Sequence, residues 1–167
     1  VANGSEGTGR RLALANWLIE PNHPLTARVI VNRIWHHHFG RGIVASIDNF
    51  GELGSRPTHP ELLDYLATRF VDSGWSIKEL HREIMTSTAY RQSSVVTDEQ
   101  LSDDPENKWV GRMQLRRLTA EEVRDSIIAV SEMFEQSQFG TPDEVNVRGD
   151  GLVTAIAKDG AYRRSIY

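Results

Sequence analysis

The apolar residues of this chain recur every three or four positions in five separate segments, which is the spacing of one helix face. The first segment follows Arg10, and Pro21 ends it. The second runs from about Leu25 to Phe39, and Gly40 is placed after it as a left-handed cap. This pattern predicts two helices near the beginning of the chain.

Three further helices are predicted from capping boxes, in which a Ser or Thr precedes a Glu by three residues. The pairs are Thr58 with Glu61, Ser76 with Glu79, and Thr119 with Glu122. The three helices carry the following apolar-face positions: Leu63, Leu66, Ala67 and Phe70; Ile77, Leu80, Ile84 and Thr88; Val123, Ile127, Val130 and Phe134. The fourth helix is expected to end near Tyr90 and to form a hairpin with the third.

Three segments lack helical spacing. Residues 40–60 contain four Gly and two Pro, which predicts a long ordered loop of the kind that is often functional. Residues 91–108 are polar and acidic, which predicts an exposed connector. After Gly140, the strings VNV, LVTAI and YRRSIY are separated by the turn signals RGDG and KDG, which predicts short strands.

The predicted fold class is mainly α. We expect a compact bundle of about five helices, with the long ordered loop and a small irregular or β-containing C-terminal part. The predicted parts are a flexible segment at 1–9, a helical domain at 10–135, and an irregular or short-strand segment at 136–167.

Composition narrows the possible functions. The chain has 167 residues, 39% hydrophobic and 25% charged, which is typical of one globular domain. It has no Cys, which excludes disulfides and thiolate zinc sites. The net charge of -4 argues against a general nucleic-acid binder, and no apolar run is long enough to span a membrane.

Three adjacent histidines, His36 to His38, suggest a metal site, but successive residues on a helix point about 100° apart and cannot converge on one ion. We therefore predict no metal and no cofactor. His38 shares a face with apolar residues and is expected to point into the core. His81 lies on the apolar face of the fourth helix and is also expected to be a core histidine.

Polar residues on the second helix and in the following loop form the candidate site. The candidate binding residues are Arg28, Asn32, Arg33, Arg41 and Arg56. Arginine holds carboxylate, sulfate or phosphate groups through paired hydrogen bonds. His37 or His59 would act as acid or base, with Asp48 orienting it. The alternative, which we prefer, is that these arginines pair with the acidic residues Asp48, Glu52 and Glu61 and fasten the loop to the helices.

A basic cluster precedes and enters the fifth helix, at Arg112, Arg116, Arg117 and Arg124. Such a cluster suggests a nucleic acid or an acidic partner. Acidic residues interleave with it, so local charge pairing is the preferred interpretation.

Four long strings, PNHPLTARVIVNRIWHHHFGRGIV, DNFGELGSRPTHPELLDYLATRF, GWSIKELHREIMTSTAYRQS and RRLTAEEVRDSIIAVS, resemble the DUF1553 (PSD1) family of planctomycete and related bacterial proteins. The resemblance runs from about Arg10 to Phe134, and RRSIY matches again. It implies a large exported or periplasmic protein that also contains a DUF1549-like domain and often a cytochrome c-like domain. The family pattern continues past RRSIY, so the chain is expected to be a fragment. The family supplies no established catalytic residues.

Three functional hypotheses remain. The leading one is a non-catalytic binding or interaction module, with other domains of the same polypeptide as partners and with a glycan or anionic ligand. The second is a hydrolase that acts on a glycan or another anionic substrate through the His, Asp and Arg residues named above. The third is a helical nucleic-acid-binding domain that uses the basic cluster.

Overall fold

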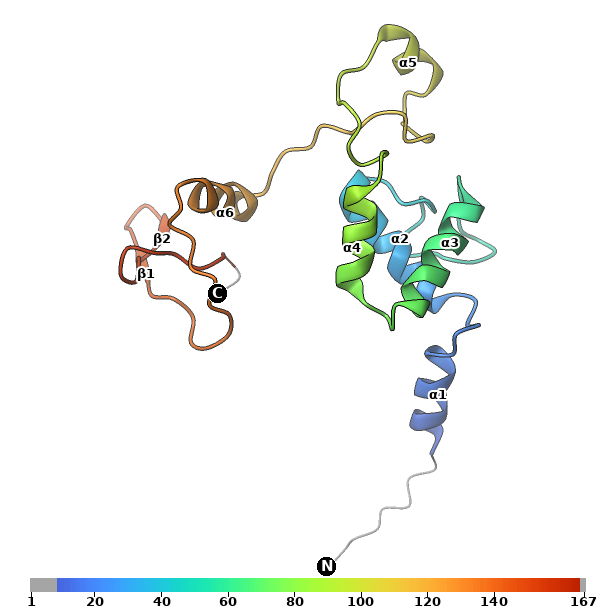
Figure 1. Ribbon diagram of the computed structural model, residues 1–167, viewed down its shortest axis with the longest axis horizontal. Coiled ribbons are helices and arrows are strands. Elements are labelled where there is room, and N and C mark those ends of the chain that lie inside the picture. The colour runs from blue at the N-terminus through green and yellow to red at the C-terminus, as the bar shows by residue number, and fades with distance from the viewer. Residues whose placement is uncertain (1–8, 166–167) are drawn as a thin grey trace, which may run out of the picture. The chain divides into compact units, whose positions relative to one another are not determined.

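The computed structural model describes residues 9–165, which divide into a first unit that ends at Leu115 and a second that begins at Arg116. Figure 1 shows mostly helices, with one pair of short strands in the second unit. The predicted class, mainly helical with a small β part, is therefore confirmed. The boundary predicted between residues 135 and 136, which separates a helical from an irregular part of the chain, stays a prediction.

Helix α2 (Thr26–Phe39) occupies nearly the range that its apolar pattern predicts. Gly40 follows it with a φ of 76°, a left-handed conformation that glycine adopts without a steric penalty. At the other end, the backbone amides of Leu25 and Thr26 donate to His23 Nδ1 at 3.2 and 3.0 Å. A histidine side chain therefore caps α2, which the sequence did not predict.

The core of the first unit lies where α2 packs against α3 (Pro60–Asp72), which in turn packs against α4 (Ile77–Thr86). The buried apolar side chains are Ala27, Val31, Trp35, Phe39, Ile43, Val44, Leu63, Leu66, Ala67, Phe70, Leu80 and Ile84. Burying each large apolar side chain contributes about 1.5–3 kcal/mol, so this set holds the unit together. The apolar face predicted for α3 is confirmed, whereas Ile77 and Thr88 are exposed.

The capping box predicted at Thr58 and Glu61 is wrong. The N-cap residue of α3 is His59, and it makes no side-chain cap hydrogen bond. Pro60 begins the helix, and it has no N–H that would need a partner. Thr58 instead closes the long loop, since its backbone amide and hydroxyl both donate to Ile43 O, at 2.9 and 3.2 Å.

Helix α4 begins as predicted and ends earlier. Ser76 Oγ accepts a hydrogen bond from the Glu79 amide at 3.3 Å, which caps the helix at the predicted residue. The helix ends at Thr86 because Ser87 is extended, with ψ of 152°. Tyr90, the predicted end, lies in the following turn and packs half-buried against the core.

Helix α1 (Arg10–Leu18) forms in the predicted place, but none of its residues is buried. Apolar spacing of this kind is usual for a helix that packs into a compact bundle, but within the part of the chain that the structure describes no apolar face of α1 is buried. One ring contact joins it to the chain ahead of α2, since Trp17 meets His23 edge-on with ring centroids 4.3 Å apart.

The predicted connector at 91–108 contains a short helix, α5 (Asp98–Asp103), that the apolar pattern missed. A capping box begins it, because Thr97 Oγ1 accepts from the Gln100 amide at 3.2 Å and the Gln100 side chain accepts from the Thr97 amide at 3.1 Å. The helix has no buried residue, so no apolar spacing could have revealed it.

In the second unit, helix α6 (Ala120–Val130) begins at the predicted capping box of Thr119 and Glu122. Its predicted apolar face is wrong: Val123, Ile127 and Val130 are exposed, and Ile128 is the buried residue. The C-terminal segment explains the difference, because it hydrogen-bonds to Arg124 and Asp125. Arg124 and Ile128 lie four residues apart and therefore share that helix face.

Strands β1 (Val145–Val147) and β2 (Val153–Ala155) pair in antiparallel register, with the predicted RGDG turn between them. Val145 lies opposite Ala155, and Val147 lies opposite Val153. The third predicted strand, YRRSIY, is not a strand within residues 162–165, where Tyr162 makes a single parallel bridge to Phe134. Its last two residues lie outside the described range.

Candidate functional site

Asn32 is completely buried and fixes the start of the long loop. Its side-chain amide donates to Val44 O at 3.0 Å, and its Oδ1 accepts from the Val44 amide at 2.8 Å. Gly42 passes so close that a Cβ there would lie 2.8 Å from the Asn32 amide nitrogen. With both of its polar groups engaged and its side chain fully buried, Asn32 braces the loop and is not accessible to a ligand.

Three of the candidate arginines form ion pairs, and two of these, Arg28 and Arg33, are on α2. Arg28 Nε lies 2.6 Å from Asp64 Oδ1, and its Nη1 donates to Pro24 O at 2.8 Å, so it joins α2 to α3. Arg33 Nη2 lies 3.4 Å from Asp48 Oδ1, where the Asp48 side chain is 94% exposed. Arg28 and Arg33 therefore hold different elements and do not form one anion clamp.

The remaining candidates are also separated. Within residues 9–165, neither His37 nor Arg56 has a hydrogen bond or an ion pair, and both are exposed. His59 Nδ1 lies 3.0 Å from Thr58 Oγ1. Arg41 and His59 line one recess, whereas Arg56 lines another hollow together with Arg28.

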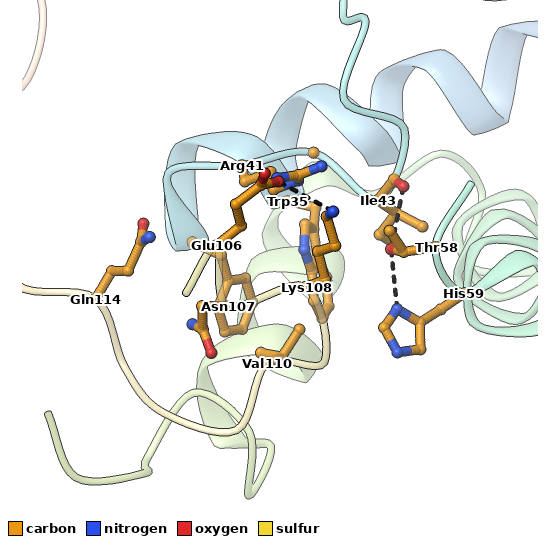
Figure 2. Close-up of a pocket in the computed structure, with 12 residues that line it drawn as sticks. Trp35, Arg41, Ile43, Thr58, His59, Glu106, Asn107, Lys108, Val110 and Gln114 are labelled. Atoms are coloured by element: carbon orange, nitrogen blue, oxygen red, sulfur yellow. Dashed lines mark hydrogen bonds and ion pairs between the residues drawn. The ribbon is translucent and has the colours of Figure 1, made fainter. Parts of the chain in front are cut away.

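The recess that Arg41 and His59 share lies at the C-terminal end of α2, where residues 106–114 fold against it. Figure 2 shows Arg41, Glu106 and Lys108 meeting beside the Trp35 ring. Arg41 Nη1 pairs with Glu106 Oε2, and Lys108 Nζ lies 3.3 Å from the same oxygen. The space is about 20 Å³, room for roughly one water molecule, so it admits neither a sugar nor a cofactor.

The chain that closes this recess is a braced turn, residues 104–112, which we call the clamped turn. The two carboxylate oxygens of Asp104 accept from the amides of Lys108 and Trp109, each at 2.8 Å. Arg112 donates to Asp104 O at 2.9 Å, and its own carbonyl accepts from the Asn107 side-chain amide at 2.8 Å. Six hydrogen bonds and ion pairs of this kind would be unusual in a mobile connector, and the Asp-Pro pair at 104 and 105 is the sequence signal for it.

Acid is expected to loosen the clamped turn. Hydrogen bonds and charge from Arg41 and then Lys108 hold the pKa of Glu106 below its ordinary value of 4.5. For Asp104, burial raises the pKa, but the amide hydrogen bonds from Trp109 and Lys108 outweigh burial and the net pKa is lowered. Both carboxylates therefore stabilise the fold above their ordinary pKa values, and this stabilisation is lost as pH falls through the lowered ones.

Amide hydrogen-exchange protection of residues 106–110, measured by NMR at about pH 6 and about pH 3, should fall at the lower pH. Glu106→Gln should remove the part of this dependence that Glu106 contributes. Glu52→Gln, in the exposed loop, serves as the matched control and should leave it unchanged. Equal protection at both pH values would contradict the prediction.

A histidine pair joins α2 to α4. His38 Nε2 lies 2.7 Å from His81 Nδ1, with ring centroids 5.0 Å apart, and Tyr90 meets the His38 ring edge-on. The sequence predicted core-facing positions for both histidines, and both are half-buried, but it did not predict that they meet. No group of three or more His, Asp or Glu side chains that could hold a metal ion is found among residues 9–165.

In the second unit, most of the basic cluster is paired locally. Arg116 Nη2 lies 2.9 Å from Glu122 Oε1, and Arg124 donates to Arg163 O at 3.1 Å. The amide and hydroxyl of Ser165 donate to Asp125 Oδ1 at 2.9 and 2.7 Å. Burial raises the pKa of Asp125, but these hydrogen bonds outweigh it and the net pKa is lowered.

Arg163 organises the rest of the second unit. Its Nε donates to Asp143 Oδ1 at 2.8 Å, and its Nη1 and Nη2 donate to the carbonyls of Phe139 and Thr141 at 2.9 and 2.6 Å. The side-chain hydrogen bond from Arg163 is the main cause of the lowered pKa of Asp143. Residues 163–165, the described part of RRSIY, therefore have a structural role, in which Arg163 binds the loop around Thr141 and Ser165 binds α6.

The first unit is thus a small helical domain in which Asn32 braces the long loop, Arg41 fastens the clamped turn, and Arg28 joins α2 to α3. The chain belongs to the family described as protein of unknown function (DUF1553), or PSD1, whose model matches residues 10–167. No curated protein and no solved structure matches it. The resemblance predicted from the sequence is therefore confirmed. No helix in residues 9–165 is long and apolar enough to cross a membrane.

Proposed function

We propose that this chain is a non-catalytic interaction module that docks, through α1, onto another domain of a longer exported polypeptide. The observation that carries the proposal is that α1 has nine residues and none of them is buried. Helices shorter than about 12–15 residues are marginal in water unless they pack against something. A helix this short therefore requires a partner surface.

The side chains of α1 suit such a partner. Leu12, Leu14 and Trp17 are 66%, 54% and 50% exposed, and Ile19 just after the helix is 61% exposed. Leu14, Trp17 and Leu18 lie three or four residues apart and therefore share one helix face, and such a group of exposed apolar side chains is typical of interaction surfaces. A DUF1549-like domain that precedes this region, often with a cytochrome c-like domain further upstream, is the partner that the family resemblance implies.

The placement of the acid and base candidates favours a module over a hydrolase. Among the described residues, neither His37 nor His59 has a carboxylate within ion-pair distance. Asp48, the proposed orienter, is exposed and pairs with Arg33. A histidine that acts as a general base is usually oriented by a partner that fixes which ring nitrogen accepts the proton. Among the described residues, neither of these two histidines has a carboxylate in position to do so.

The basic cluster gives little support to nucleic-acid binding. Arg112 is engaged by the carbonyls of Asp104 and Pro105, and Arg116 is engaged by Glu122. Binding to a phosphate backbone requires cationic side chains that are free to displace counterions. We therefore keep the interaction module as the proposed function.

The docking is tested by hydrogen exchange in the longer native polypeptide and in this chain alone. We expect amide protection across residues 10–19 to be at least about tenfold greater in the longer protein, because the partner covers α1. Leu14→Glu should abolish that gain. Leu53→Glu is the matched control, because Leu53 is 92% exposed in the long loop and its replacement should change nothing. Equal exchange of residues 10–19 in both proteins would overturn the proposal.

A further inference from the structure

Trp109 is the most exposed of the four tryptophans, at 69% of its surface. Trp35 is 6% exposed and belongs to the core, and Trp75 is half-buried against it. Trp17 lies on α1 among other apolar side chains. An indole left in water forgoes the free energy of burial, and exposed tryptophans are concentrated at sites where a ligand or partner covers them.

The backbone that carries Trp109 is fixed. Its amide is held by Asp104, and the Arg41, Glu106 and Lys108 ion pairs fasten the clamped turn to the end of α2. Figure 2 shows this attachment beside Trp35.

Two residues of the clamped turn, Asn107 and Val110, have positive φ values of 50° and 53°. Asparagine tolerates this conformation, but it is strained for a β-branched residue such as valine. Such strain persists only where the surrounding contacts determine the backbone, and it is concentrated at functional sites. The turn therefore presents Trp109 on a preorganised backbone, so a ligand that stacks on the ring need not order the chain.

The surroundings of Trp109 select the class of ligand. Residues 103–108 are Asp-Asp-Pro-Glu-Asn-Lys, with the Glu106 and Lys108 side chains 56% and 48% exposed. A protein partner would need a contiguous apolar patch, and the residues that precede the ring in the sequence contribute no apolar side chain to one. A sugar ring places its flat C–H face on the indole and its hydroxyls, which both donate and accept, against neighbouring charged side chains.

The net charge near Trp109 disfavours anionic ligands. Residues 98–112 contain two basic side chains, Lys108 and Arg112, against five acidic ones: Asp98, Glu99, Asp103, Asp104 and Glu106. This local negative charge repels sulfated glycans and nucleic acids, although a nucleobase could also stack on an indole. A neutral sugar is not repelled by this negative charge.

We propose that the clamped turn is a binding site for a neutral glycan, which stacks a sugar ring on Trp109 and hydrogen-bonds through its hydroxyls to exposed charged side chains of the turn. The site lies apart in sequence from the candidate arginines on α2 and does not depend on α1, so this proposal can be tested separately from the docking proposed above.

The test is native affinity electrophoresis of the full chain in gels that contain laminarin, xylan or galactomannan. We expect at least one of these neutral polysaccharides to retard the chain, and Trp109→Ala to weaken the retardation about tenfold, the loss expected for one stacking contact. Trp109→Phe should keep part of it. Phe139→Ala is the matched control, because Phe139 is also an exposed aromatic side chain, at 78%, and its replacement should leave the retardation unchanged.

Because Trp109 has an exposed side chain, its replacement should leave the far-UV circular dichroism spectrum unaltered. Asp104→Ala provides a second variant. It keeps the indole but removes the carboxylate that binds the backbone amides of Lys108 and Trp109, so it should also weaken the retardation. No retardation by any of the three polysaccharides would overturn the proposal. So would equal retardation of the Trp109→Ala variant, or retardation only by heparin or single-stranded DNA.

Discussion

Replacing Asn32 with alanine should lower the free energy of unfolding of the first unit by about 2–5 kcal/mol, measured by urea denaturation. The substitution removes both hydrogen bonds to Val44, which is 3% exposed. The Val44 amide and carbonyl would then be buried without partners, and each unsatisfied buried group costs about 1–3 kcal/mol. The loop that begins there carries Ile43 and Val44 into the core, so its release would also expose apolar surface.

Two further variants make this prediction specific. Asn32→Asp keeps an acceptor for the Val44 amide but sets a carboxylate oxygen against the Val44 carbonyl, so it should destabilise as well. Asn22→Ala, at an exposed position ahead of α2, should change the free energy of unfolding by less than about 0.5 kcal/mol. A similarly small change for Asn32→Ala would show that the loop does not depend on this amide.

Replacing Arg163 with alanine should selectively unfold the second unit. Its side chain is 12% exposed, and it bonds at once to Asp143 and to the carbonyls of Phe139 and Thr141. Few large apolar side chains are buried in this unit, where Ile128 is the buried hydrophobic residue among those described. The polar ties from Arg163 therefore carry more of the unit's stability than they would in a unit with a larger core, and an uncompensated Asp143 would remain.

The measurement is limited proteolysis or hydrogen exchange read separately for residues 116–165 and 9–115, because the two units need not unfold together. Cleavage or exchange within 116–165 should rise at least about tenfold, while the first unit is unaffected. Arg148→Ala is the matched control, since Arg148 pairs with Asp150 where both side chains are more than half exposed. If the two variants behaved alike, Arg163 would not be the organising residue.

Local patterns predicted the helices well. The spacing of apolar residues in α2 and α3 and the side-chain caps of α4 and α6 act over a few residues, so they can be recognised from the sequence alone. The same reasoning was wrong about burial in α1 and α6, because burial depends on what lies opposite a helix. In α6 the segment around Ser165 lies against the side of Asp125, and the face with Ile127 is left exposed.

The site residues were predictable only in part. Arg41 was a candidate from the start, but its partner Glu106 lies 65 residues further along the chain. The acidic composition of residues 91–108 predicted a solvated connector, because composition does not show that Asp104 binds two backbone amides of its own turn. The sequence also could not show that the Asn32 side chain hydrogen-bonds to the backbone of Val44, because that contact depends on how the loop turns back toward α2.

The contact between His38 and His81 has a consequence for proton positions. One nitrogen of the contact must carry the hydrogen and the other must be bare, so the tautomer of one ring dictates that of the other. The positions of the imidazole hydrogens on α2 and α4 are therefore coupled, although the two histidines lie 43 residues apart in the chain.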